Sequence, residues 1–120
     1  MRLARPVALL AFASLLVACR TTVATVNQRP AKYYQETVTL RGQVMRMQNL
    51  PGETLLEIAD ARGARILVQV KGGFEHATGD WIEVKGILVP EARVGDQLVY
   101  DVVVAEDVDD ASAPWFRNLF

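Results

Sequence analysis

The stretch VTLRGQV at residues 38–44 and the stretch IEVKGIL at residues 82–88 follow one pattern, and this pattern decides the fold. Both place apolar residues at alternate positions around a basic residue and a glycine, which is typical of a β-strand with one buried face. Gly42 and Gly86 stand at the same place in the two stretches. Glycine inside a strand often marks a sharp bend. We therefore predict two strands that bend at their glycines and curl into a closed sheet.

Three further segments have the composition of strands, so the sequence predicts five strands in all. After the first strand the apolar positions shift to Met45 and Met47, which indicates a β-bulge or a sharp bend. Residues 60–63 (DARG) supply a glycine for a hairpin turn between the second and third strands. The predicted strands cover residues 38–44, 54–59, 65–71, 81–89 and 97–108.

The connecting segments and the strand faces carry further predictions. Residues 72–80 hold at most one helical turn because glycines flank this segment, and residues 90–96 are expected to form a loop. Leu67 is predicted to point outward from the third strand. In the fifth strand the alternation predicts one shared face, made of Leu98, Tyr100, Val102 and Val104.

The strand order resembles that of the OB-fold, a five-stranded Greek-key β-barrel. The resemblance covers residues 37–108 and implies an all-β domain. An open antiparallel sandwich is the alternative, and it would leave strand edges to be covered. The chain is also similar to the small periplasmic bacterial OB-fold proteins, which carry L-x-G-x-[IV] in the first strand and D-x-x-G in a turn, and more faintly to the outer-membrane starvation-inducible lipoproteins. The positions that match the two motifs are Leu40, Gly42, Val44, Asp60 and Gly63.

The N-terminal segment has the layout of an export signal. Arg2 and Arg5 precede an apolar run at residues 7–18, which is too short for a permanent membrane-spanning helix. Residues 16–19 (LVAC) resemble the lipobox of bacterial lipoproteins. This resemblance implies cleavage before Cys19 and lipid on Cys19, with acyl chains such as palmitate as the membrane anchor. Cys19 is the only cysteine of the chain, so no disulfide is expected.

The lipobox resemblance also implies a location and a division of the chain. Arg20, rather than aspartate, follows the cysteine, which by family analogy favours the outer membrane of a Gram-negative cell, facing the periplasm. Removal of the signal leaves 120 − 18 = 102 residues, enough for one domain. We expect a signal peptide, a lipidated cysteine with a tether, an OB-like barrel and an aromatic tail. Their predicted ranges are 1–18, 19–31, 32–110 and 111–120.

The charge of the processed chain bears on nucleic-acid binding. Loss of Arg2 and Arg5 leaves 11 basic and 14 acidic residues, a net charge of −3, which does not attract a polyanion at long range. OB barrels that bind single strands stack bases on aromatic side chains of the second and third strands, and here those strands contain none. Binding of single-stranded nucleic acid or of a small ligand stays open as the alternative function. A five-stranded barrel is narrow enough for side chains to fill it, which favours a surface site over an internal cavity.

The sequence does not show the residue sets that catalysis requires. A serine triad needs a histidine beside a serine, but the processed chain has one serine, Ser112, in its tail and one histidine, His76, in a connector. A zinc site needs several converging ligands, and only Glu75 lies near His76 in sequence. We predict no enzyme activity, no cofactor and no metal.

The C-terminal tail and the outward-facing Leu67 are the predicted interaction residues. Trp115 with Leu119, and Phe116 with Phe120, form two apolar pairs at i, i+4 of a short helix. Two roles are open for this tail, which either covers its own barrel or docks into a partner. Because aromatic residues are common interface anchors, we predict a non-catalytic, lipid-anchored binding or adapter module of the cell envelope whose partner is a protein.

Overall fold

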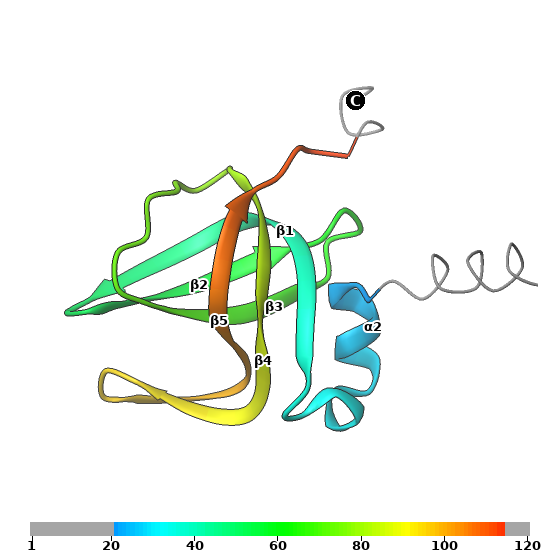
Figure 1. Cartoon of the computed structure of the whole chain (residues 1–120), viewed down its shortest axis with the longest axis horizontal. Coiled ribbons are helices and arrows are strands. Elements are labelled where there is room, and N and C mark those ends of the chain that lie inside the picture. Colours follow the sequence, from blue (N-terminus) through cyan, green and yellow to red (C-terminus); the bar gives the residue numbers. More distant parts are fainter. Residues whose placement is uncertain (1–20, 115–120) are drawn as a thin grey trace, which may run out of the picture.

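The computed structural model of the chain describes residues 21–114. It consists of one short helix, one 3-10 helix and five strands (Figure 1). Within this range there is no helix long and apolar enough to span a membrane. The elements are α2 (Val23–Gln28), η1 (Pro30–Tyr33), β1 (Thr37–Leu50), β2 (Glu53–Ala59), β3 (Arg65–Lys71), β4 (Trp81–Val94) and β5 (Gln97–Asp110).

The five strands close into a barrel in the order β1-β2-β3-β5-β4. Neighbouring strands are antiparallel except β3 and β5, which run parallel. This is the Greek-key arrangement of the OB-fold. The predicted all-β, five-stranded barrel is confirmed, and the open sandwich is excluded because β1 pairs with both β2 and β4.

Alternating apolar side chains fill the barrel, as the sequence pattern predicts. Each fully buried side chain of this size stabilises the fold by roughly 1.5–3 kcal/mol. The buried residues that β3 and β4 contribute to the main core are Ile66, Val68, Val70, Ile82, Val84 and Leu88. The predicted bulge in β1 is also confirmed, because Val44 lies opposite Ile58 whereas Arg46 lies opposite Glu57, which leaves Met45 as the extra residue.

The two glycines of the repeated pattern lie where the backbones of neighbouring strands come close. A Cβ atom on Gly42 would lie 3.0 Å from the carbonyl oxygen of Ala59 and 3.1 Å from the side chain of Ile58. A Cβ atom on Gly86 would overlap the carbonyl oxygen of Val104, at a point where the β4–β5 register shifts. A Cβ atom therefore has no room at Gly86, and at Gly42 it would fit only if its neighbours moved by a few tenths of an ångström.

The prediction of a loop over residues 90–96 is wrong. β4 continues through Pro90 to Val94, and the turn to β5 is made by Gly95 and Asp96 alone. Pro90 is tolerated because β4 pairs with β1 only as far as Ile87, so the missing N–H faces no β1 partner. The result is a hairpin that extends beyond the barrel, visible as the yellow-to-orange arc in Figure 1.

The predicted face of β5 is also wrong. Asp101 has a positive φ of 53°, which interrupts the alternation of side chains along the strand. Leu98 and Tyr100 are consequently 44% and 62% exposed, while Val102 and Val103 are both fully buried although they are adjacent.

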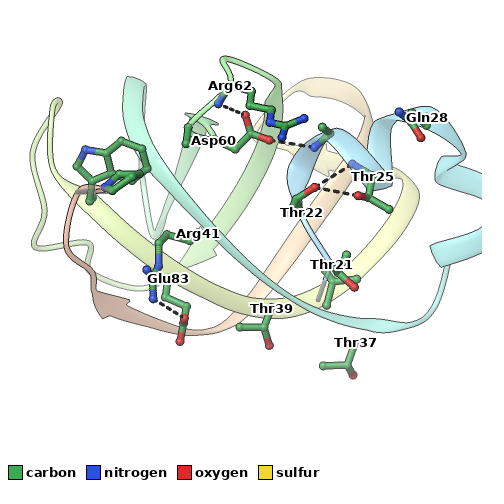
Figure 2. Close-up of a pocket in the computed structure, with 15 residues that line it drawn as sticks. Thr21, Thr22, Thr25, Gln28, Thr37, Thr39, Arg41, Asp60, Arg62 and Glu83 are labelled. Atoms are coloured by element: carbon green, nitrogen blue, oxygen red, sulfur yellow. Dashed lines mark hydrogen bonds and ion pairs between the residues drawn. The ribbon is translucent and has the colours of Figure 1, made fainter. Parts of the chain in front are cut away.

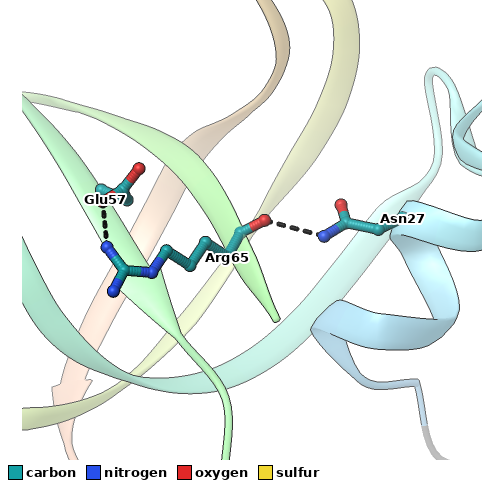
Figure 3. A network of polar contacts seen from close by, with 3 residues as sticks. All are labelled: Asn27, Glu57 and Arg65. Carbon is teal, nitrogen blue, oxygen red and sulfur yellow. Dashed lines mark hydrogen bonds and ion pairs between the residues drawn. The ribbon is translucent and has the colours of Figure 1, made fainter. Parts of the chain in front are cut away.

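The predicted tether over residues 19–31 needs correction, because most of its described part is folded onto the barrel. α2 begins after Thr22, whose side chain accepts a hydrogen bond from the Thr25 backbone N–H and so caps the helix. Val23 and Val26 of α2 are fully buried in the main core. Asn27 donates from Nδ2 to the Arg65 carbonyl at 2.7 Å, which ties the helix to β3 (Figure 3).

Candidate binding groove beneath the β4–β5 hairpin

The β4–β5 hairpin, residues 89–101, is held against β2 and β3 by hydrogen bonds. The Gly95 N–H at its tip donates to Glu53 Oε2 at 3.1 Å. Gln69 Nε2 donates to the other oxygen of Glu53 at 2.7 Å and to the Arg93 carbonyl at 3.3 Å. Glu53 of β2 and Gln69 of β3 thus form one latch that fixes the tip of the hairpin.

The latch changes the acidity of its carboxyl group. The hydrogen bond from Gln69, followed by the one from the Gly95 backbone and by the positive charge of Lys71, lowers the pKa of Glu53 from its ordinary value. Each of these interactions favours the carboxylate over the acid. Glu53 is therefore an acceptor for both donors at neutral pH.

The base of the hairpin is held by a second polar contact. Tyr34, which follows η1, donates its phenol hydrogen to Asp101 Oδ1. This hydrogen bond raises the pKa of Tyr34, and burial and the Asp101 charge act in the same direction. Because Asp101 is also the residue with positive φ, the bond fixes the point at which the hairpin leaves the barrel.

Three buried apolar residues of β2, β4 and β5 do not belong to the main core cluster. Leu55 is only 8% exposed, and Val94 and Val102 are fully buried, yet all three lie outside the main core cluster. Leu55 of β2 lies directly opposite Gln69 of β3. Val94 belongs to β4 and Val102 to β5. The tip of the hairpin also lies near an apolar side chain, because a Cβ atom on Gly95 would lie 3.5 Å from the side chain of Leu50.

A groove of about 270 Å³ remains between the hairpin and strands β1, β2 and β3. Leu55, Leu67 and Val99 provide an apolar surface in this groove. Its polar residues are Arg46, Gln48, Glu57 and Gln97. The strand 2–3 face and the β4–β5 loop are the parts of an OB-fold that commonly hold ligands, so this groove is the candidate binding site.

The charges of the groove are unevenly compensated. Glu57 accepts a hydrogen bond from the Arg65 guanidinium at 2.9 Å, so its negative charge is paired (Figure 3). Arg46, which lies opposite Glu57 across the β1–β2 pair, is exposed and makes no ion pair within residues 21–114. The site therefore combines apolar side chains with one uncompensated positive charge.

The predicted site residues fall into two groups. Leu67 lines the groove, with its side chain partly exposed. Cys19 and the tail residues lie outside the described residues, and their predicted roles stay predictions. The tail residues are Trp115, Phe116, Leu119 and Phe120.

The sequence did not predict that Leu55 of β2 and Val99 of β5 line the groove together with Leu67. The consecutive residues Leu55 and Leu56 break the alternation of β2, which signals a strand that is buried on both faces. Val99 had no such signal, because its position over the sheet depends on the hairpin that β4 and β5 form.

The residues considered for catalysis do not come together in a recognisable reactive site. His76 Nε2 lies 2.6 Å from Asp110 Oδ1, and its ring lies against Phe74. Ser112 is exposed beyond the end of β5. In the part of the chain that the structure describes, no group of three or more His, Cys, Asp or Glu side chains is arranged to hold a metal ion.

Comparison with known proteins supports the fold. No protein-family model and no curated protein sequence matches the chain. A putative aspartyl-tRNA synthetase from Leishmania major Friedlin is similar in structure, with 13% identity, a TM-score of 0.59 and coverage of 81% of this chain and 22% of that one. Asparaginyl-tRNA synthetase from Pyrococcus horikoshii is similar too, with 18% identity, a TM-score of 0.59 and coverage of 80% and 24%. The chain spans about a quarter of the length of these enzymes or less, and the likeness concerns the OB-fold alone.

Proposed function

We propose that this chain is a non-catalytic binding module of the cell envelope that holds an apolar side chain of a protein partner in the groove beneath its hairpin. The observation that carries the proposal is the apolar surface of Leu55, Leu67 and Val99 in a groove of about 270 Å³. This volume is slightly below the range of roughly 300–1,000 Å³ of typical small-molecule sites. A single anchoring side chain of a protein fits such a space, and buried anchors supply most of the energy of many interfaces.

The charge at the groove refines the expected partner. Arg46 is positive and uncompensated, while Glu57 is neutralised by Arg65. A partner segment with an acidic residue beside its apolar anchor would match both the apolar surface of the groove and the positive charge of Arg46. Electrostatic complementarity of this kind mainly favours specificity and the rate of association.

The membrane anchor is the second part of the proposal, and it rests on the lipobox-like residues 16–19. Cys19 would carry the lipid, and the outer membrane facing the periplasm is the proposed location. Since α2 begins at Val23, only the three residues 20–22 separate Cys19 from the helix. The four residue-to-residue steps from Cys19 to Val23 span at most about 14 Å, so the barrel would lie close to the lipid surface.

Single-stranded nucleic acid is the second candidate ligand, favoured by the structural likeness to two tRNA synthetases. The residues that line the groove include one arginine, one glutamate and no aromatic side chain. Base stacking, which supplies much of the affinity in single-strand binding, therefore has no platform in this groove. The protein partner is the better supported proposal.

Site-specific photocrosslinking in the native envelope tests the proposal. A photoreactive amino acid in place of Gln48, on the groove, should form a defined adduct with one envelope protein, and Leu67→Arg should abolish it by blocking the apolar surface. The same amino acid in place of Lys85, on the β1–β4 surface, is the matched control and should form no such adduct. An adduct that survives Leu67→Arg would contradict the proposal. Binding of single-stranded RNA that falls steeply with salt would favour the second candidate instead.

A further inference from the structure

A second pocket, larger and more polar than the groove, lies between α2 and the barrel (Figure 2). Its volume is about 770 Å³, well within the range of roughly 300–1,000 Å³ of small-molecule sites. The α2 segment, the start of β1, the β2–β3 turn and the start of β4 form its walls. We call it the threonine pocket because five threonines line it, namely Thr21, Thr22, Thr25, Thr37 and Thr39.

Several polar side chains of the threonine pocket are available to a ligand. The hydroxyls of Thr22 and Thr25 hydrogen-bond to each other at 2.9 Å, and Thr22 also caps α2, so part of their hydrogen-bonding capacity is used. Thr37 and Thr39 are exposed on β1, and Gln28 is exposed on α2. The side chains of these three residues make no hydrogen bond to the rest of residues 21–114. Hydroxyl and amide groups both donate and accept, which suits a ligand that does the same.

The fixed charges of the threonine pocket cancel. Arg41 and Glu83 lie 3.7 Å apart as an ion pair across β1 and β4. Asp60 is buried, and its oxygens already accept from the backbone N–H groups of Ala24, Arg62 and Ala64. Arg62 also lines the pocket, so its lining carries two positive side chains, Arg41 and Arg62, and two negative ones, Asp60 and Glu83.

The neighbouring surface disfavours an anionic ligand. Asp109 and Asp107 of β5 lie opposite Glu83 and Lys85 of β4, so the sheet beside the pocket gains two carboxylates and one ammonium group, a net charge of −1. A phosphate-rich or sulfated ligand would meet these charges. The pocket therefore fits an uncharged ligand with many hydroxyl groups.

We propose that the threonine pocket binds a neutral oligosaccharide. The hydroxyls of Thr37 and Thr39 and the amide of Gln28 would hydrogen-bond to sugar hydroxyls, and Trp81, which also lines the pocket, contributes an aromatic surface. This site is separate from the groove beneath the hairpin. It does not depend on the proposed protein partner or on the lipid anchor.

Titration of the full chain with chitotetraose and with cellotetraose, followed by calorimetry and by amide chemical shifts, tests this proposal. At least one neutral tetrasaccharide should bind with a dissociation constant of about 1 mM or lower, and shifts should concentrate at Thr37, Thr39 and Gln28. Thr37→Val with Thr39→Val should weaken binding about fivefold or more, because each variant removes a hydrogen bond while it keeps a β-branched side chain. Gln28→Leu tests the opposite wall in the same way.

Matched variants make the outcome decisive. Thr78→Val, in the exposed connector before β4, and Leu67→Arg, in the groove, should leave the tetrasaccharide affinity unchanged. The proposal is overturned if neither tetrasaccharide binds, if the threonine and glutamine variants bind as well as the parent, or if only a heparin tetrasaccharide binds. A loss of affinity on Leu67→Arg would also overturn it, because the sugar would then occupy the groove.

Discussion

Tyr34 and Asp101 stand 67 residues apart in the sequence, and the Tyr34 hydroxyl donates a hydrogen bond to the Asp101 carboxylate. The bond joins the segment that precedes the barrel to the base of the hairpin that covers the candidate groove. Asp101 has a positive φ, which asparagine and aspartate tolerate better than most residues. This pair therefore links the conformation of the hairpin to the N-terminal segment.

The Tyr34 bond should make stability depend on alkaline pH. The pKa of Tyr34 is raised above its ordinary value of 10.0, so the folded state favours the protonated phenol. Its contribution is fully present below that ordinary value and is lost as the pH rises through the raised pKa. Melting temperatures measured from about pH 8 to 11 should fall for the parent chain at the alkaline end. Tyr34→Phe should begin lower and lose less over the same range, and parallel curves would contradict this role.

The latch at Glu53 should open in acid. The pKa of Glu53 is lowered from its ordinary value of 4.5, so its contribution is present above that value and is lost as the pH falls through the lowered pKa. Hydrogen exchange at the Gly95 amide should show protection at neutral pH that disappears in this acid range. Glu53→Ala should remove the protection at every pH, whereas Glu91→Ala, on an exposed part of the hairpin, should not. Equal protection in the parent and Glu53→Ala would exclude the latch.

The close approach at Gly86 should make alanine costly there. Gly86→Ala would drive a methyl group into the Val104 carbonyl and against Ala105 Cα at 2.9 Å, and we expect a loss of about 1–3 kcal/mol in the free energy of unfolding. Gly42→Val should be similarly destabilising because Ala59 and Ile58 leave no space. Urea denaturation measures both. Gly73→Ala is the control, since no atom lies within 4 Å of its added Cβ, and an equal loss there would refute the steric explanation.

The burial of α2 predicts that its valines contribute to stability. Val26 is fully buried in the main core, so Val26→Ala should cost about 1–3 kcal/mol in the free energy of unfolding. Thr25→Ala gives a reference for the exposed face, although it also removes a hydroxyl that contacts Thr22. Thermal unfolding that is unaffected by Val26→Ala would restore the interpretation of this segment as a tether.

The proposed lipid anchor has a direct test at Cys19. Cys19→Ser removes the thiol that would be acylated, so the variant should accumulate as an unprocessed precursor and take up no labelled palmitate. The parent chain should incorporate the label and fractionate with membranes. Normal processing of Cys19→Ser would contradict the proposed anchor while leaving the groove and the threonine pocket unaffected.

Local sequence determined much of the barrel. The alternation of Ile66, Val68 and Val70, the bulge after Val44 and the turn closed by Gly63 were all predictable, because each depends on side-chain period or turn geometry within a few residues. The same local information indicated that Leu67 faces outward, which placed one residue of the groove.

Tertiary structure decided the rest. Residues 91–94 form a strand because they pair with residues 97–100. The helix α2 is held on the barrel by hydrogen bonds from Ala24 to Asp60 and from Asn27 to Arg65. The groove exists because Glu53 and Gln69 hold a hairpin that lies far away in the sequence. Such contacts depend on strand register and on the closure of the barrel. The residues that make these contacts show no periodic sequence pattern from which register or closure could be predicted.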